Sequence, residues 1–261
     1  MIRKTLEVLL KDKTRKRYLP DNVGGLPIYA STAGGLRQLF YPMSSVDPDL
    51  FQTAISIISP GDVVWDIGAN VGLFSVAARG LVGPNGKVFS FEPDTKLIDL
   101  LRKNSILKAT NAGEMNVIPA GVAGKTGVRT FNIAKRARAS NSLQGYGNTQ
   151  TGGVRISQSI ICLSIDDCLY EISKPDVVKI DVEGAEQELL ENSTQLLSVV
   201  RPRIAVEVSV PTRAAITELL KDNSYKLFDA NSPFKKDLEI ERAAWNTIGI
   251  PVEQMDLVFR E

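Results

Sequence analysis

The most informative absence in this sequence is histidine, of which its 261 residues contain none. Without imidazole, the chain has no Ser-His-Asp or Cys-His catalytic group and no metal site that includes histidine. Its 2 cysteines, Cys162 and Cys168, are too few for a disulfide framework or a zinc site made of cysteines alone. Any proton transfer must therefore use Asp, Glu, Lys, Tyr, Cys or water.

The sequence also lacks long apolar runs. No stretch approaches the ~20 apolar residues that cross a bilayer, and basic residues interrupt the N-terminus where a signal peptide would be apolar. Together with the scarcity of cysteine, this favours a reduced, cytoplasmic protein without a transmembrane segment. The sequence does not indicate an oligomeric state.

A large charge excess of one sign is missing as well. The net charge of +1 argues against broad nucleic-acid binding, so no nucleic-acid partner is expected. Residues 1–19, however, hold seven basic residues against two acidic ones. This excess is either a solvated helix face or a source of attraction to an anionic membrane surface, an acidic glycan or RNA.

The composition, 43% hydrophobic and 23% charged, is that of a globular protein with one large domain and a small extension. We expect residues 1–46 to form a basic helix to about Tyr18 and then a Gly/Pro-rich cap segment. That segment is either a lid over the site or an ordinary extension. Residues 47–261 form the main domain, which begins with a helix at Asp47-Pro48.

The stretch from Val63 to Phe74 has the pattern of nucleotide-binding proteins. An apolar run predicts a buried strand, a glycine-bearing turn follows, and an apolar-periodic helix comes next. Gly68 has no β-carbon, so a ligand can approach the main chain beside the unpaired N–H groups of the next helix. Asp66 would repel a pyrophosphate and suits a ligand with a cationic or hydroxyl-rich end. The predicted cofactor-binding residues of this turn are Asp66, Gly68, Ala69, Asn70 and Gly72.

The next strand supplies the second half of the predicted cofactor site. Lys87 to Phe91 reads as a strand that ends at Glu92-Pro93, and an acid at this place accepts hydrogen bonds from ribose hydroxyls. A third strand, Met115 to Ala120, ends at Gly121, where folds of this class often meet adenine. The turn differs from the Gly-x-Gly-x-x-Gly pattern, which disfavours NAD and favours S-adenosylmethionine (SAM).

Four motifs carry a resemblance to a known family. D-I-G-A-N-V-G at 66–72, F-E-P at 91–93, L-S-I-D-D at 163–167 and K-I-D-V-E-G-A-E at 179–186 resemble the FkbM family of SAM-dependent methyltransferases, in that family's order and approximate spacing. The similarity runs from about Pro48 to the C-terminus. It implies the class I SAM-methyltransferase fold, a doubly wound and mostly parallel seven-stranded sheet with an antiparallel last strand. Periodicity alone supports only a doubly wound α/β fold.

The resemblance also implies O-methylation of a hydroxyl on a glycan, a polyketide or another small molecule. Two alternatives stay open: an RNA 2′-O-methyltransferase and a non-catalytic SAM-binding module. We also predict that a β-hairpin is inserted in the main domain, with arms at 128–133 and 160–163. The polar loop between the arms either gates the substrate or is disordered. The resemblance makes Asn141 and Ser142 of this loop the first candidates for substrate binding.

Charged residues gather at the ends of two further predicted strands. Lys179 and Asp181 share one face of the strand from Pro175 to Asp181, and Asp181 stands at its carboxyl end, where open α/β sheets bind ligands. Glu207 ends the next strand and would point into the same crevice. Glu183, a predicted substrate-binding residue, is expected to open a helix that runs to about Ser198.

These residues form the predicted catalytic group. Asp181, which is also a cofactor candidate, or Glu207 would accept the proton of the acceptor hydroxyl, and Lys179 would orient its partner or lower that partner's pKa. Helix capping and a salt bridge are the structural alternative. A magnesium site of Asp181, Glu183 and Glu207 is a further one, although our preferred interpretation has no metal. For the tail, the pattern predicts a helix from 211 to 223 and strands at 225–229 and 256–260.

Overall fold

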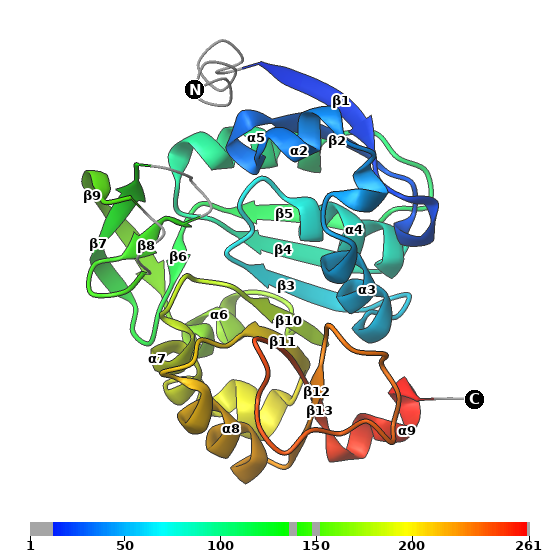
Figure 1. Ribbon diagram of the computed structural model, residues 1–261, viewed down its shortest axis with the longest axis vertical. Coiled ribbons are helices and arrows are strands. Elements are labelled where there is room, and N and C mark those ends of the chain that lie inside the picture. Colours follow the sequence, from blue (N-terminus) through cyan, green and yellow to red (C-terminus); the bar gives the residue numbers. More distant parts are fainter. Residues whose placement is uncertain (1–12, 136–139, 148–151, 260–261) are drawn as a thin grey trace.

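A seven-stranded sheet forms the centre of the computed structural model, which describes residues 13–135, 140–147 and 152–259 (Figure 1). The strand order is β12-β13-β11-β10-β3-β4-β5, and β13 runs in the direction opposite to the other six strands of this sheet. The strands are β3 (Val63–Ile67), β4 (Lys87–Phe91), β5 (Glu114–Ile118), β10 (Val177–Ile180), β11 (Arg203–Glu207), β12 (Tyr225–Asp229) and β13 (Asn246–Pro251). The predicted class I methyltransferase fold is confirmed.

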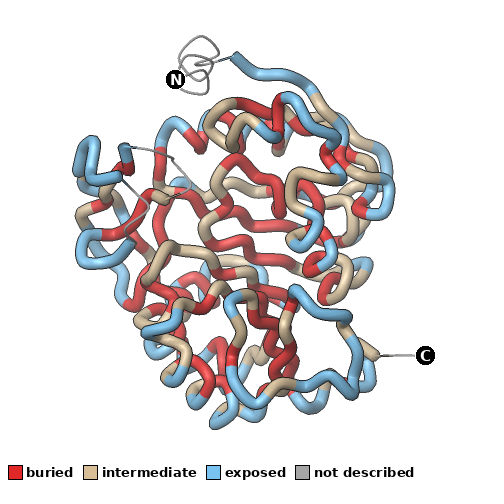
Figure 2. Tube along the Cα trace, viewed as in Figure 1, coloured by how far each residue is buried: buried red, intermediate tan, exposed pale blue. Residues whose placement is uncertain are grey.

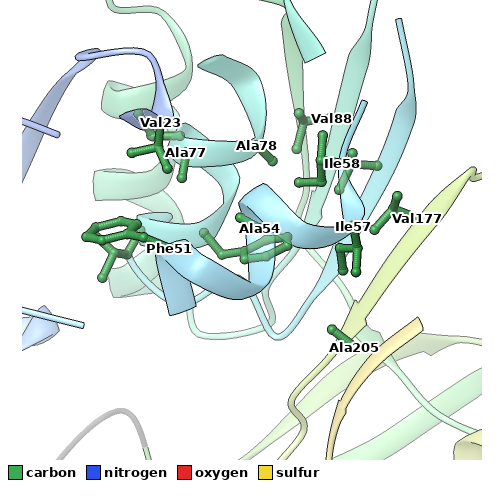
Figure 3. Packing of buried hydrophobic residues seen from close by; sticks show 14 of the residues in the cluster. Val23, Phe51, Ala54, Ile57, Ile58, Ala77, Ala78, Val88, Val177 and Ala205 are labelled. Atoms are coloured by element: carbon green, nitrogen blue, oxygen red, sulfur yellow. The ribbon is translucent and has the colours of Figure 1, made fainter. Parts of the chain in front are cut away.

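Helices cover both faces of this sheet, because successive strand residues point to opposite sides. Val64 packs into one apolar cluster with α3 (Pro48–Ile57), α4 (Leu73–Val82) and α5 (Thr95–Ser105). Trp65 packs into the other with α6 (Ile165–Glu171), α7 (Glu186–Glu191) and α8 (Arg213–Asp222). Figure 3 shows Ile57 of α3 in the first cluster together with Ala77 of α4 and Val177 of β10. Figure 2 shows the strands between the helices as the most buried part of the molecule.

The predicted helix start at Asp47-Pro48 is confirmed. The side chain of Asp47 accepts a hydrogen bond from the Leu50 amide at 3.2 Å, with Pro48 in the first turn of α3. Ser164 caps α6 in the same way by accepting from the Asp167 amide at 3.1 Å. Each cap fixes where the chain leaves a loop and enters a helix.

The N-terminal segment differs from the prediction. Residues 14–18 are not helical but form β1 (Thr14–Tyr18), which pairs antiparallel with β2 (Pro27–Ser31); the earlier part of the predicted helix, 1–12, lies outside the described residues. Arg15 and Arg17, two positions apart on one side of the strand, both donate to the Leu39 carbonyl, at 3.2 and 2.8 Å, at the end of α2 (Leu36–Phe40). Because side chains two residues apart lie on the same side of a strand, Arg15 and Arg17 can both reach the same carbonyl group.

The segment from 19 to 46 shares its core with the main domain. Leu19, Val23 and Ile28 are buried in the same cluster as α3 and α4. Asn104 of α5, fully buried, accepts from the Tyr29 amide at 2.7 Å and donates to the Val71 carbonyl at 2.9 Å. These contacts fix β2 against α5 and the glycine turn.

A second sheet lies beyond the carboxyl ends of the central strands, at the left of Figure 1. Its order is β6-β9-β7-β8, with β6 (Gly121–Val122), β7 (Gly127–Ala134), β8 (Ser142–Leu143) and β9 (Val154–Leu163). The antiparallel pairing of β7 with β9 is the predicted hairpin. Parts of the predicted gating loop, 136–139 and 148–151, lie outside the described residues.

Two predictions for the second half of the chain were wrong. The helix expected from Glu183 begins only at Glu186, ends at Glu191 and is followed by a separate helical turn, Leu196–Val200. The strand expected at 256–260 is instead the short helix α9 (Met255–Val258). The last strand is β13, whose Gly249 and Pro251 weaken a strand pattern in sequence; pairing with both β11 and β12 overrides that weakness.

Both cysteines are buried and free. Within the described ranges, no helix is both long and apolar enough to span a membrane.

Candidate active site

A cavity opens at the carboxyl ends of β3, β4 and β10, facing the second sheet. Of the residues predicted from sequence, eight line it: Gly68, Asn70, Glu92, Pro93, Gly121, Asn141, Asp181 and Glu183. The other predicted residues, Asp66, Ala69, Gly72, Ala120, Ser142, Lys179 and Glu207, lie around it without lining it.

Gly68, directly after β3, lies against the backbone of Asp181, directly after β10. Its φ of +82° lies in the left-handed region, and a β-carbon there would fall 1.8 Å from the carbonyl oxygen of Asp181. Only glycine satisfies both conditions. The residue is therefore required by the protein's own backbone, whatever ligand the cavity holds.

The amide groups of the glycine turn are already paired. Gly68 and Ala69 donate to the Phe91 carbonyl at 3.1 and 2.9 Å, and Asn70 donates to the Glu92 carboxylate at 2.8 Å. The end of β4 therefore uses these turn amides, whereas the expected ligand contact with the N–H groups of the following helix stays a prediction. The turn amides hold the turn in register with Glu92. Gly72 serves packing instead, since a β-carbon there would fall 2.6 Å from Leu101.

Glu92 has a fixed geometry in the cavity wall. One carboxylate oxygen accepts from the Asp94 amide and the other from the Asn70 amide, each at 2.8 Å, and the residue is 5% exposed. Burial raises the pKa of Glu92 to about 7, against the lowering effect of these two hydrogen bonds. Each oxygen keeps a lone pair, so the carboxylate can accept a pair of neighbouring hydroxyl groups.

Asn70, next to Glu92, holds a strained conformation with φ of 52°. Its amide oxygen is buried and has no hydrogen-bond partner among the described residues. Since Asn70 lines the cavity, a hydrogen-bond donor bound there would satisfy this atom.

Lys179 joins the two central strands beneath the cavity. Its ammonium group lies 3.3 Å from Asp66 and 3.2 Å from Asp181, and it donates to the Gly68 carbonyl at 3.2 Å. Burial alone would lower the pKa of Lys179, but the charges of Asp181 and Asp66 outweigh it and raise the pKa. Lys179 is therefore permanently charged, and all three of its N–H bonds are engaged.

Asp66 does not line the cavity. It is fully buried and accepts from the hydroxyl of Ser75 at 2.5 Å, which in turn accepts from Ser90 at 2.8 Å. It stands opposite Lys179 in the parallel pairing of β3 with β10. The arrangement gives Asp66 the task of holding Lys179, which differs from the direct cofactor contact that the sequence suggested.

Carboxyl groups crowd the side of the site next to β10 and β11. Burial, followed by the charges of Asp181 and Glu207, raises the pKa of Glu183 to about 8. Burial, followed by the charge of Asp181, raises the pKa of Glu207 to about 7. Glu183 has φ of 55°, an unfavourable conformation for a glutamate. Raised pKa values and backbone strain are both common at functional sites.

Asn141 connects the second sheet to the cofactor side of the cavity. It accepts from the Ala134 amide at 2.9 Å and donates to the carboxylate of Asp94 at 2.8 Å. Ser142 is 4% exposed and donates to the Tyr146 carbonyl at 3.1 Å, inside its own loop. Thus Asn141 reaches the cavity and Ser142 supports the loop.

Sequence reasoning missed several residues that build the site. Asp94 caps α5 and holds Asn141, and it could have been found as the polar residue between Pro93 and a helical pattern. Glu186 accepts from the amides of Val182 and Gly184, which makes it the acid that fixes the turn before α7. The apolar lining had no signal in sequence: Leu97, Val122, Phe131, Leu143, Ile160 and Val182.

No three Asp, Glu or Cys side chains converge closely enough to hold a metal ion in the part of the chain that the structure describes. The hydrogen-bonding and apolar groups that line the cavity match the chemical groups of SAM. Glu92 can accept from ribose hydroxyls, the unsatisfied oxygen of Asn70 can accept from an amino group, and the apolar lining can enclose a base.

The family model and the curated relatives that match this chain are all methyltransferases. The FkbM methyltransferase domain matches residues 66–227. The chain is 30% identical to the hexuronic acid methyltransferase AglP of Haloferax volcanii over 158 residues, 59% of each protein's length. It is 26% identical to the methyltransferase sdnD of Sordaria araneosa over 216 residues, which are 70% of this chain and 76% of that relative.

Among solved structures, the chain is similar to an FkbM methyltransferase of Methylobacillus flagellatus, with 15% identity and a TM-score of 0.44. That similarity covers 94% of this chain and 56% of the other. A SAM-dependent O-methyltransferase of Thermotoga maritima has 13% identity and a TM-score of 0.42, covering 78% of this chain and 65% of the other.

Proposed function

Since the chain belongs to the FkbM methyltransferase family, we propose that it is a SAM-dependent O-methyltransferase acting on a hydroxyl group of a glycan, a polyketide or another small molecule. The observation that carries the proposal is the geometry of Glu92, a buried carboxylate at the end of β4 with both oxygens oriented by backbone amides. A diol such as that of ribose matches such a carboxylate. The carboxyl group of Asp181 lies across the same cavity.

SAM bound in this cavity would supply an electrophilic methyl group on a sulfonium. The chain's own residues would then hold the acceptor oxygen in line with that methyl group and remove its proton. In the transfer, the acceptor O–H bond breaks, a new O–C bond forms, and the C–S bond breaks with its electron pair left on sulfur. In-line positioning of this kind contributes as much as ~7–11 kcal/mol in favourable cases.

Glu207 does not line the cavity itself, but its carboxyl group is close enough to those of Asp181 and Glu183 to interact with them, and it is our candidate for the general base. Its pKa of about 7, raised by burial and by the charge of Asp181, is suited to accepting a proton near neutral pH. The carboxylate of Asp181 forms an ion pair with Lys179 at 3.2 Å, so we assign Asp181 to orienting the acceptor rather than to accepting its proton. Lys179 acts as a positioning residue, because it holds Asp66, Asp181 and the Gly68 carbonyl together.

For the acceptor, a sugar hydroxyl is the first choice. AglP is named for a hexuronic acid substrate, and the chain aligns with 59% of its length. Asn141 and Glu183 line the cavity from the side of the second sheet and the β10 turn, and both can bind hydroxyl groups. A neutral and an acidic glycan therefore belong in the first acceptor panel.

The test is release of S-adenosylhomocysteine from SAM in the presence of that panel, comparing wild type, Glu207→Gln and the exposed control Glu218→Gln. We expect Glu207→Gln to lose ~10²–10⁴-fold in kcat and to lose the inflection near pH 7, with unchanged SAM affinity. Glu218→Gln should match wild type. Full activity of Glu207→Gln would reject its role, and SAM binding without turnover on any acceptor would reject the enzymatic proposal.

A further inference from the structure

A basic groove lies at the opposite end of α5 from the cavity. Thr14, Lys16 and Tyr29 of the β1–β2 pair form one wall, and Lys103, Ile106, Leu107 and Lys108 at the end of α5 form the other. Leu97, in the first turn of α5, lines the active-site cavity. The length of α5, which rises about 1.5 Å per residue, therefore separates the groove from the cavity.

The groove has fixed walls. The buried side chain of Asn104 binds the Tyr29 amide at 2.7 Å on one wall and belongs to α5 on the other. The groove is therefore part of the fold rather than a gap between independent segments.

The lysines of the groove have no acidic partners. Among the ion pairs of the described residues, none includes Lys16, Lys103 or Lys108, and no acidic residue lines the groove. A lysine at a helix C-terminus stabilises the helix dipole, which accounts for Lys103. It does not account for Lys16, which is on a different element and faces the same space.

The charge of the surrounding segments has the same sign. Residues 13–46 contain five basic residues and one acidic residue, and residues 95–110 contain four basic and one acidic. The whole chain is nearly balanced, with 31 basic and 30 acidic residues, so positive charge is concentrated at this end of the molecule.

Apolar and aromatic groups are exposed between these charges. Ile106 is 79% exposed between Lys103 and Lys108, and Tyr18 is 61% exposed, with the Lys16 ammonium 5.7 Å from its ring centre. Basic side chains interleaved with exposed aliphatic and aromatic ones are suited to the interface of an anionic bilayer, where phosphates attract the former and the headgroup region accepts the latter. Figure 1 shows β1 on the outer surface of the molecule, and Figure 2 shows that it is exposed.

We propose that this groove, with Lys16, Lys103 and Lys108 around Ile106, is a docking site for an anionic membrane surface. Docking there leaves the active-site cavity, at the far end of α5, open to an acceptor. The proposal is independent of the methyl-transfer reaction, and its test uses no substrate.

The experiment is co-sedimentation of the full chain with vesicles of phosphatidylcholine alone and of phosphatidylcholine mixed with phosphatidylglycerol, at low and high salt. The test variant is Lys103→Gln/Lys108→Gln. The matched control is Lys125→Gln/Lys174→Gln, two exposed lysines outside the groove and outside the ion pairs of the described residues. Circular dichroism melting of each variant confirms folding.

We expect wild type to bind only the anionic vesicles and to release at high salt. The groove variant should lose roughly fivefold in affinity for each lysine removed, while the control changes little. Ile106→Ser should weaken binding and leave the salt dependence intact. Equal losses in the two double variants, equal binding to both vesicle types, or no binding by wild type would overturn the proposal. So would lysine-dependent binding of a short RNA without vesicle binding.

Discussion

Gly68 and Asp181 are so close that a β-carbon on Gly68 would fall 1.8 Å from the carbonyl oxygen of Asp181. The two residues stand at the ends of neighbouring parallel strands and both line the cavity. The proposed cofactor residues and the proposed catalytic residues are thus parts of one rigid unit. A change in either strand end should disturb both halves of the site.

Replacing Gly68 with alanine tests this unit. Alanine must adopt a φ of +82° and push the Asp181 carbonyl away, so we expect a clear loss of stability, of about 1–3 kcal/mol, and a loss of SAM affinity. Denaturant unfolding and calorimetry measure the two effects. Gly61→Ala, at φ of +91° with open space around it, is the matched control and should lose stability without losing SAM affinity. Equal SAM affinity in Gly68→Ala and wild type would contradict the close coupling.

The Lys179 ion pairs predict a strong non-additive effect. Lys179→Met leaves the fully buried carboxylate of Asp66 without its cation, which should cost about 3–5 kcal/mol of stability. Adding Asp66→Asn should restore much of that loss, because the uncompensated charge is then removed. Urea unfolding of the single and double variants measures the coupling. Additive losses would show that Asp66 and Lys179 do not depend on each other.

Replacing Glu183 with glycine should raise the stability of the protein and weaken its function. Glycine relieves the strain at φ of 55° and removes a carboxyl group crowded by Asp181 and Glu207, so Glu183→Gly should be more stable by about 0.5–1 kcal/mol. If Glu183 contacts the acceptor, the KM for the acceptor should rise at the same time. Ser224→Gly, at φ of 58° and outside the cavity lining, should gain stability without any change in KM. A less stable Glu183→Gly with normal kinetics would contradict both statements.

SAM affinity should depend on pH through Glu92. Burial raises the pKa of this carboxyl from its ordinary 4.5 to about 7, so most Glu92 side chains in the free protein are protonated at pH 6 and ionised at pH 8. Ribose hydroxyls donate to the ionised form, so affinity should fall by about tenfold from pH 8 to pH 6. Calorimetry at both pH values measures it. Glu92→Gln should bind weakly without this step; the same tenfold step in Glu92→Gln would assign it to another group.

The sequence predicted the central fold because the strand, turn and helix patterns from Val63 to Phe91 are local and strongly periodic. It placed Lys179 and Asp181 together correctly, because alternation along one strand determines which side chains share a face. It missed the strand at Arg15 and Arg17, because the pairing with β2 and the acceptors at the end of α2 are tertiary contacts.

Burial caused the other differences at the site. Asp66 was expected to face a ligand, but in the fold its partner is Lys179, from a strand more than a hundred residues away in sequence. The amides of the glycine turn are paired with Phe91 and Glu92, because β4 ends beside the turn, and no local pattern predicts this pairing. The apolar wall from Phe131 and Leu143 depends on how the second sheet packs, and no local pattern predicts that.

The most direct test of the central claim is calorimetric titration of wild type and Glu92→Ala with SAM and S-adenosylhomocysteine at pH 8. The account predicts micromolar binding of both ligands by wild type and its loss in Glu92→Ala, while the groove variant Lys103→Gln/Lys108→Gln binds as wild type does. Wild-type affinity in Glu92→Ala, or no binding of either ligand by folded wild type, would contradict the assignment of this cavity to SAM.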